Sequence, residues 1–121
     1  MTAALEQTMN FSDESAFHDA ANIWLEALFE LLELEDVEAC LDIELENGIM
    51  QIMTDEKTTL VISKHAPSQQ LWLSSPISGG LHFNALEEGA DWVLKDGRQL
   101  SVVISEELHH LTGEEFTPNV V

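Results

Sequence analysis

The first periodic pattern in the chain is helical. Apolar side chains recur every three or four residues and would form one face: Phe17, Ala21, Trp24, Leu28, Leu31 and Leu32. Polar side chains fall on the opposite face: Asp19, Asn22, Glu26, Glu30 and Glu33. This spacing predicts an amphipathic helix that ends near Leu34, because Glu35 would fall on the apolar side. Ser12 is the candidate N-cap, and two acids follow it where the helix dipole favours them.

An alternating pattern comes next and predicts strands. Between residues 37 and 46 one set of positions would face a core: Val37, Ala39, Leu41, Ile43 and Leu45. The positions between them, Cys40 included, would face outward. Asn47-Gly48 predicts a tight hairpin turn. Five more strands are predicted at residues 49–53, 58–63, 70–73, 81–83 and 91–95, with a charged turn at 55–57.

A second helical pattern closes the chain. Residues 100–111 carry an apolar stripe of Leu100, Val103, Ile104, Leu108 and Leu111, and Gly113 suits the C-terminal cap. The order helix, antiparallel meander, helix predicts an α+β fold. It would be a two-layer α/β sandwich, with both terminal helices packed on one face of an antiparallel sheet of about six strands. We expect one domain over residues 1–121, with a frayed N-terminus over 1–11 and a C-terminal tail over 114–121.

The charge of the chain limits its partners. It holds 23 Asp and Glu against 4 Lys and Arg, a net charge of -19, and 45% hydrophobic residues still allow a core. Residues 1–46 contain 13 of the acids and no Lys or Arg. Such a field repels nucleic acid and anionic membranes and attracts cations and basic protein surfaces. We therefore expect neither nucleic acid nor membrane as a partner. A merely solvating surface is the alternative.

The cellular compartment is constrained by what the chain contains. A single cysteine, Cys40, rules out an internal disulfide and fits a reducing compartment. No apolar run reaches the roughly 18 residues that cross a membrane. Residues 1–10 hold no Lys or Arg, which argues against a secretory signal or an Arg-rich presequence. We expect a bacterial cytoplasmic protein. A mature organellar protein without its presequence would show the same pattern.

Six acids are expected along one edge of the sandwich: Glu26, Glu30, Glu33, Asp36, Asp42 and Glu44. We call this set the acidic ridge. Carboxylates suit hard cations, so the ridge is a candidate site for iron or other divalent cations. The sequence has no EF-hand or His-Glu-x-x-His motif, and binding should therefore be weak, multi-site and screened by salt. His18 and Asp19 are secondary candidates, although His18 is better explained as a surface histidine.

The most distinctive segment surrounds Trp72. No charged residue occurs between Ser68 and Ala85, and the sequence 70–80 passes from an apolar strand into a turn-rich loop. Trp72 is either a core residue or a partner contact, since a Trp suits both places. His65 and His82 are expected in loops on either side. Trp24 and Trp92 are predicted to be core residues.

Trp72-Leu-Ser-Ser-Pro-x-Ser-Gly resembles the signature of the frataxin family, and the likeness extends over about residues 17–113. The resemblance, to the bacterial CyaY type in particular, implies an iron-binding regulator or iron donor in iron–sulfur cluster assembly. It implies binding to a cysteine desulfurase and a scaffold protein through Glu30, Glu33, Trp72 and Ser74. A monomer that forms oligomers with iron is also implied. Phe29, Leu34, Ser63 and His65 depart from family positions.

Enzymatic activity is not expected. Ferroxidase activity is attributed to some frataxins, but the sequence shows no Glu-x-x-His pair on two facing helices. Paired carboxylates also serve glycoside hydrolysis, which needs a pocket that an open acidic edge does not offer. The alternative function is a generic acidic domain without a role in cluster assembly. Such a domain would buffer metals, bind a basic partner or mimic nucleic acid.

Overall fold

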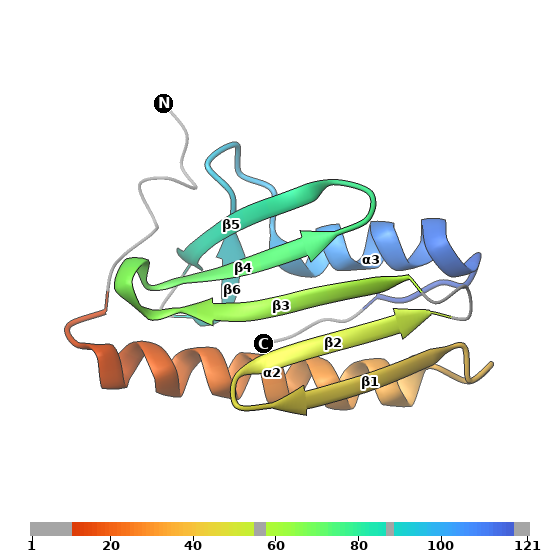
Figure 1. Cartoon of the computed structure of the whole chain (residues 1–121), viewed down its shortest axis with the longest axis horizontal. Coiled ribbons are helices and arrows are strands. Elements are labelled where there is room, and N and C mark those ends of the chain that lie inside the picture. Colours follow the sequence, from red (N-terminus) through yellow and green to blue (C-terminus); the bar gives the residue numbers. More distant parts are fainter. Residues whose placement is uncertain (1–10, 55–57, 87–88, 118–121) are drawn as a thin grey trace.

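The computed structural model describes residues 11–54, 58–86 and 89–117 and shows two layers (Figure 1). One layer is a six-stranded antiparallel sheet in which the strand order follows the chain. Its strands are β1 (Leu41–Glu46), β2 (Ile49–Thr54), β3 (Thr59–His65), β4 (Gln70–Ser75), β5 (Gly79–Leu86) and β6 (Asp91–Val93). The other layer holds α2 (Glu14–Glu35) and α3 (Leu100–Thr112), both on the same side of the sheet. The predicted fold class is confirmed.

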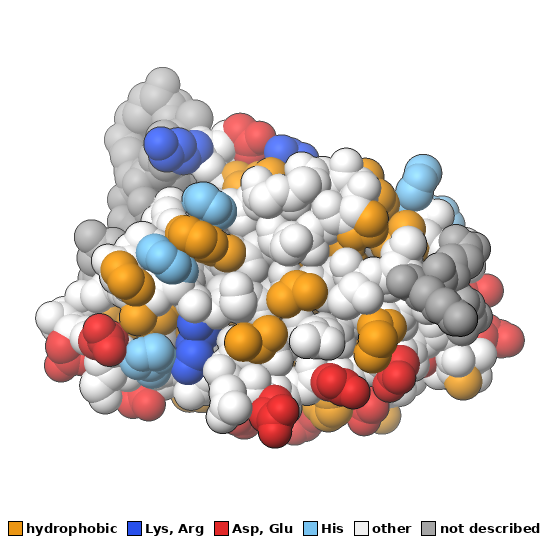
Figure 2. Space-filling model, in the orientation of Figure 1, with side chains coloured by type: hydrophobic (Ala, Val, Ile, Leu, Met, Phe, Trp, Pro, Cys, Tyr) orange, Lys and Arg blue, Asp and Glu red, His pale blue; other side chains and the backbone are white. Residues whose placement is uncertain are grey.

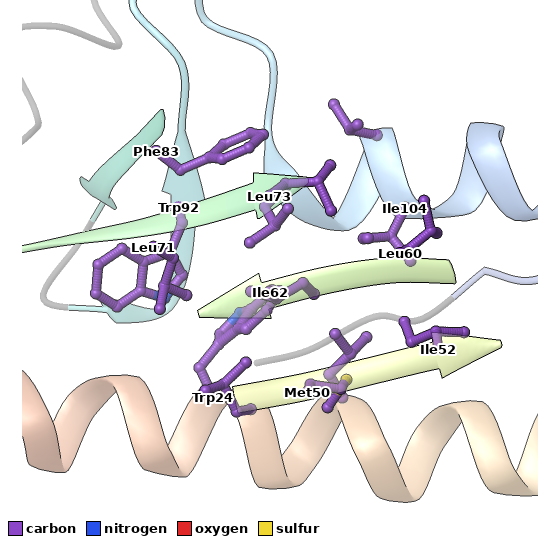
Figure 3. Close-up of a cluster of buried hydrophobic side chains, with 14 of the residues drawn as sticks. Trp24, Met50, Ile52, Leu60, Ile62, Leu71, Leu73, Phe83, Trp92 and Ile104 are labelled. Atoms are coloured by element: carbon purple, nitrogen blue, oxygen red, sulfur yellow. The ribbon is translucent and has the colours of Figure 1, made fainter. Parts of the chain in front are cut away.

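The core lies between the sheet and the two helices. Figure 3 shows Trp24 of α2 and Ile104 of α3 directed toward side chains such as Met50, Ile62 and Leu71 of the sheet. Trp24 and Trp92 are at most 2% exposed, as predicted. Leu71 and Leu73 are buried as well, so the alternation in β4 turns Trp72 to the opposite face of the sheet. The outer face is therefore the surface on which a functional site can be sought.

Helix α2 begins one residue later and ends later than predicted. Its N-cap is Asp13, not Ser12, because the Asp13 carboxylate accepts from the backbone N–H of Ala16 at 2.8 Å. The helix also includes Glu35, whose carboxylate accepts from the backbone N–H of Thr117 at 2.9 Å. A polar partner from the C-terminal segment thus makes an acid acceptable at a position that the hydrophobic pattern had excluded.

The predicted strand 37–46 is too long, since β1 begins only at Leu41. Asp36 ends α2, and its carboxylate accepts from the backbone N–H groups of Cys40 and Leu41 at 2.8 and 3.0 Å. Ala39 has a positive φ of 53°, which breaks the alternation. Val37 is consequently 82% exposed and Cys40 is buried, the reverse of the prediction. From Leu41 on, the predicted alternation is correct.

The remaining elements agree with the prediction in type and differ in extent. Asn47 and Gly48 have positive φ values of 54° and 75°, the geometry of the tight hairpin turn that was predicted. Strands β3, β4 and β5 are longer than predicted, and β6 is shorter. Gly113 caps α3 in the left-handed conformation. The predicted turn at 55–57 lies outside the described residues.

Both ends of the described chain pack onto the domain. Phe11 contacts the Phe17 and Trp92 rings, with centroid distances of 6.0 and 6.2 Å, so the predicted fraying does not apply to it. Residues 1–10 lie outside the described residues. Phe116 is 2% exposed, and the tail therefore packs as far as residue 117. No described helix combines the length and apolar character needed to cross a membrane.

Candidate functional site: an acidic edge and a tryptophan on the outer sheet face

The acidic ridge follows the edge of the molecule formed by α2 and β1. Glu26, Glu30 and Glu33 are exposed on α2, and Asp42 and Glu44 are exposed on β1. Figure 2 shows acidic side chains along this lower edge of the outer face. Among the described residues, no ion pair involves any of these acids. Their negative charge is therefore available to cations and basic surfaces in solution.

The ridge acids do not converge on one point. Glu26 and Glu30 line a groove of about 700 Å³ between α2 and the β1–β2 hairpin, which Lys64 also lines. Asp42 and Glu44 lie on the outer face of the sheet. Nowhere in the described parts of the chain do three or more His, Cys, Asp or Glu side chains form a group that could hold a metal ion. The arrangement supports dispersed cation binding more than a single ligand cage.

Two predicted metal ligands have structural partners of their own. Asp36 holds the backbone of Cys40 and Leu41, so its carboxylate oxygens are already engaged. His18 lies 3.6 Å from the Glu14 carboxylate, one helical turn earlier. Asp19 is exposed near the start of α2. A metal ion would have to compete with these contacts at Asp36, whereas the other ridge acids are open to it.

Trp72 lies on the outer face of the sheet between two histidines. The His65 and His82 rings stack on its two sides, with centroid distances of 3.8 and 4.1 Å and interplanar angles of 13° and 10°. We call His65, Trp72 and His82 the three-ring stack. His82 is directly opposite Trp72 in the register, and His65 is opposite Gln70. Both histidines are strand residues, so their predicted placement in loops was wrong.

Hydrogen bonds fix the orientation of the Trp72 indole. Its Nε1–H donates to Gln70 Oε1 at 2.9 Å, and the Ser68 hydroxyl donates to the same oxygen at 3.0 Å. Gln70 Nε2 in turn donates to Asn84 Oδ1 at 3.2 Å. The network connects η1 (Ala66–Ser68), β4 and β5. The indole is therefore preorganised on the surface before any partner arrives.

A buried carboxylate anchors the loop that follows Trp72. Glu107 of α3 is 7% exposed and accepts from the hydroxyls of Ser75 and Ser78 at 2.5 and 2.7 Å. The Ser75 oxygen accepts in turn from the backbone N–H groups of Ile77 and Ser78. Ser74, the other predicted partner residue, is exposed. Sequence reasoning missed Glu107, although its place between Val103, Ile104 and Leu108 could have indicated it.

Basic residues gather at the far end of the sheet from the ridge. A shallow cleft of about 490 Å³ lies between β5 and the 94–98 turn, and its lining includes His82, Lys95, Asp96 and Arg98. Asp96 accepts from the backbone N–H of Arg98 and pairs with its guanidinium at 3.0 Å. These contacts lower the pKa of Asp96, the backbone hydrogen bond most. The outer face thus has an acidic edge at one end and a basic region at the other.

Comparison with known proteins identifies the family. The family model described as a frataxin-like domain matches residues 10–114. The chain belongs to the frataxin family. An iron–sulfur cluster assembly protein CyaY of Pseudomonas fluorescens is 33% identical over 106 residues, which cover 85% of this chain and 92% of that protein. The mitochondrial frataxin homolog of Saccharomyces cerevisiae is 37% identical over 97 residues, covering 76% of this chain and 54% of that protein.

Solved structures agree with the sequence relatives. The frataxin of Psychromonas ingrahamii has a TM-score of 0.77 at 19% identity, covers 86% of this chain and 95% of its own, and shows the shared fold. A trimeric yeast frataxin complexed with ferrous iron has a TM-score of 0.61 at 30% identity, covering 91% and 96%. The chain spans about half the length of the mitochondrial relatives that it matches.

Proposed function

We propose that this frataxin-family protein binds iron weakly through the acidic ridge and regulates iron–sulfur cluster assembly, or donates iron to it. It does so by docking on a cysteine desulfurase and its scaffold protein. The observation that carries the proposal is the outer sheet face itself. A preorganised Trp72, in a segment without Asp, Glu, Lys or Arg, shares this face with an acidic edge that has no ion pair among the described residues, in a family whose bacterial members are named for cluster assembly.

The two parts of this face would contribute differently to docking. Exposed charges act over a Debye length, about 8 Å at physiological salt, so the ridge would steer a basic partner surface and speed encounter. Trp72 is held by hydrogen bonds and stacking, so little conformational entropy would be lost when it becomes buried. It would supply the anchor at the centre of the contact, where Trp is often a hot spot.

Iron is cargo in this proposal and not a resident cofactor. Five of the six ridge acids are exposed and spread over α2 and β1, which favours several weakly held ions with retained water ligands. Other divalent cations would compete for the same oxygens. The open edge also favours a regulator or iron donor over an enzyme, because acid–base catalysis depends on groups whose pKa is shifted by an enclosed site.

The first test is sulfide production by the source organism's cysteine desulfurase with its scaffold protein, measured anaerobically at two ferrous iron levels. We expect the rate to change when this protein is added, and the size of the change to depend on iron. An unchanged rate at both levels, with no complex detected, would contradict the proposal. It would leave the alternative of an acidic metal-buffering domain.

A second test separates the ridge from Trp72. Glu30→Lys/Glu33→Lys should weaken binding to the desulfurase with a strong dependence on salt, because the lost term is electrostatic. Trp72→Ala should weaken binding by about tenfold or more with little dependence on salt. Glu106→Lys, which reverses the charge of an exposed acid of α3 outside the ridge, serves as the control. Equal salt slopes for the ridge and Trp72 variants would contradict this division.

A further inference from the structure

The three-ring stack leaves only the edges of its rings open to a partner. His65 covers one face of the Trp72 indole at 3.8 Å and His82 covers the other at 4.1 Å. An arriving side chain therefore cannot stack on the indole without displacing a histidine. Ring edges carry the positive end of the aromatic quadrupole, and imidazole N–H groups are donors. Trp72 and neutral His65 already donate their N–H groups to Gln70 and Ser68, so the free His65 nitrogen, Nε2, offers a hydrogen bond to a partner's acceptor only when the ring is protonated.

The hydrogen-bond network defines where the His65 ring takes up a proton. Trp72 Nε1–H can only donate, so the Gln70 atom that it contacts is the acceptor Oε1. The Ser68 hydroxyl donates its hydrogen to the same Oε1. Ser68 Oγ must then accept from His65 Nδ1–H at 2.7 Å. The second proton of His65 would enter at Nε2, so protonation leaves the network and the stack intact.

Among the described residues, the three strands that carry the stack contain no acid, and Glu46 of β1 lies three strands from Trp72 in the same cross-strand row. Strands β3, β4 and β5 hold no Asp or Glu, and Lys64 of β3 donates to Asn22 on the helix side of the sheet. The charged groups near His82 come from the 94–98 turn: Lys95, Asp96 and Arg98. Asp96 is paired with Arg98, so Lys95 gives this region a positive balance. In a chain of net charge -19, the stack is a local exception.

We propose that His65 and His82 are specificity-determining residues of the docking face, and that the stack receives a carboxylate-bearing segment of the partner complex. This inference rests on the proposed function. Histidine gains its charge between about pH 8 and pH 5. A protonated imidazole on the face of a Trp is also favoured by the cation–π interaction. Acidification therefore adds positive charge at the contact without dismantling it, and docking strengthens as the pH falls.

The test measures the affinity of the full chain for the desulfurase–scaffold complex at pH 8 and pH 6. We expect binding about three- to tenfold tighter at pH 6, a size that two partly exposed charge pairs would give. His65→Phe/His82→Phe keeps three stacked rings and removes both titratable groups, so it should lose this pH response. His109→Phe/His110→Phe, which removes two exposed histidines of α3, should retain it and controls for the titration of histidines outside the stack.

The outcomes distinguish the two proposals. A wild-type complex with no pH response, or a response that survives in His65→Phe/His82→Phe, overturns the role of the stack and leaves the proposed function standing. A wild-type chain that forms no complex at either pH overturns both. If the wild type binds but His65→Phe/His82→Phe does not, a measurement on the wild-type protein without its partner tests the inference. A Trp72 indole N–H resonance that moves between pH 8 and pH 6 supports the inference, and one that stays still overturns it.

Discussion

Glu107 illustrates how a single residue can give a sequence motif its shape. The Ser-Ser-Pro-x-Ser loop after Trp72 is closed by two hydroxyls that donate to this one buried carboxylate. Charge-assisted hydrogen bonds of this kind are stronger than those between neutral groups. The motif therefore depends on an acid 29 and 32 residues away from its two serines. The path of the loop that follows Trp72 is thus fixed by the hydrogen bonds of its serines to Glu107 of α3.

Replacing Glu107 should be costly for stability. Glu107→Ala would leave the buried Ser75 hydroxyl without its acceptor and would free the exposed Ser78 hydroxyl, which should lower the free energy of unfolding by about 1–3 kcal/mol. Chemical denaturation monitored by circular dichroism would measure this. Glu106→Ala, at the exposed neighbouring position, should change it by less than about 0.5 kcal/mol. Equal effects of the two substitutions would contradict the anchoring role.

Asp91 should make stability depend on pH in a defined direction. Burial raises the pKa of its carboxyl group, although Ser101 and the Trp92 backbone N–H partly offset this by donating to it. Because the pKa is higher in the folded state than in the unfolded state, this group makes its full contribution to stability at pH values below the unfolded pKa. That stability is lost as the pH rises through the folded pKa. Asp91→Asn should therefore gain stability relative to the wild type as the pH rises from about 3.5 to 6.

Parallel denaturant titrations of the wild type and Asp91→Asn across this pH range would check the direction. Asp96 is a useful contrast, because its hydrogen bond from Arg98 lowers its pKa and gives the opposite sign. Asp96→Asn should lose stability relative to the wild type as the pH rises. Two variants that drift in the same direction would show that general charge effects, and not these local contacts, control the response.

At the level of elements, the junction between α2 and β1 depends on one side chain. Asp36 ends the helix and accepts from the backbone N–H groups of Cys40 and Leu41 at the start of β1. Residues 37–39 bridge the two elements without belonging to either. The direction of the first strand, and hence the position of Asp42 and Glu44 on the ridge, follows from this connection.

Asp36→Ala should therefore destabilise the domain by about 1–3 kcal/mol, because two backbone N–H groups lose a charged acceptor. Thermal unfolding would report the loss. Glu38→Ala, an exposed acid in the same connection, has no comparable role and is the matched control. A larger loss from Glu38→Ala than from Asp36→Ala would contradict the account.

The sequence predicted elements well wherever the hydrophobic pattern was decisive. Periodicity alone predicts the two helices and the burial of Trp24 and Trp92, and turn chemistry predicts the Asn47-Gly48 turn. The errors arose from side-chain hydrogen bonds across the fold. Asp36 accepts from the backbone N–H of Leu41, so β1 begins later than predicted. The backbone N–H of Thr117 donates to Glu35, so α2 can include this acid. Predicting that His65 and His82 stack on Trp72 would have required the register between the strands, which the hydrophobic pattern does not specify.

At the scale of the whole molecule, charge is the dominant feature. The chain of 121 residues has a net charge of -19, and its acidic side chains repel one another more strongly in the compact folded state than in the unfolded chain. The five exposed ridge acids lie on one edge of the domain, where this repulsion is concentrated. Salt and bound cations should both relieve it.

We expect the free energy of unfolding to rise by on the order of 1 kcal/mol when NaCl increases from 0.05 to 0.5 M. At equal ionic strength, MgCl₂ should stabilise the protein more than NaCl, because an ion that binds only the folded state adds to screening. Thermal melts in the two salts would measure both effects. Equal melting temperatures in the two salts would argue against cation binding by the folded ridge.

The order of the strands has a consequence for how the chain folds. Each strand of β1 to β6 pairs with the next one along the sequence, so every pairing of the sheet closes a short loop. Such local pairing lowers the contact order and speeds folding. The contacts between distant parts of the chain come from the ends, where Phe11 meets Trp92 and Glu35 meets Thr117. We infer that the meander can form early, and that the slow event is the closing of the two helical ends over one finished sheet.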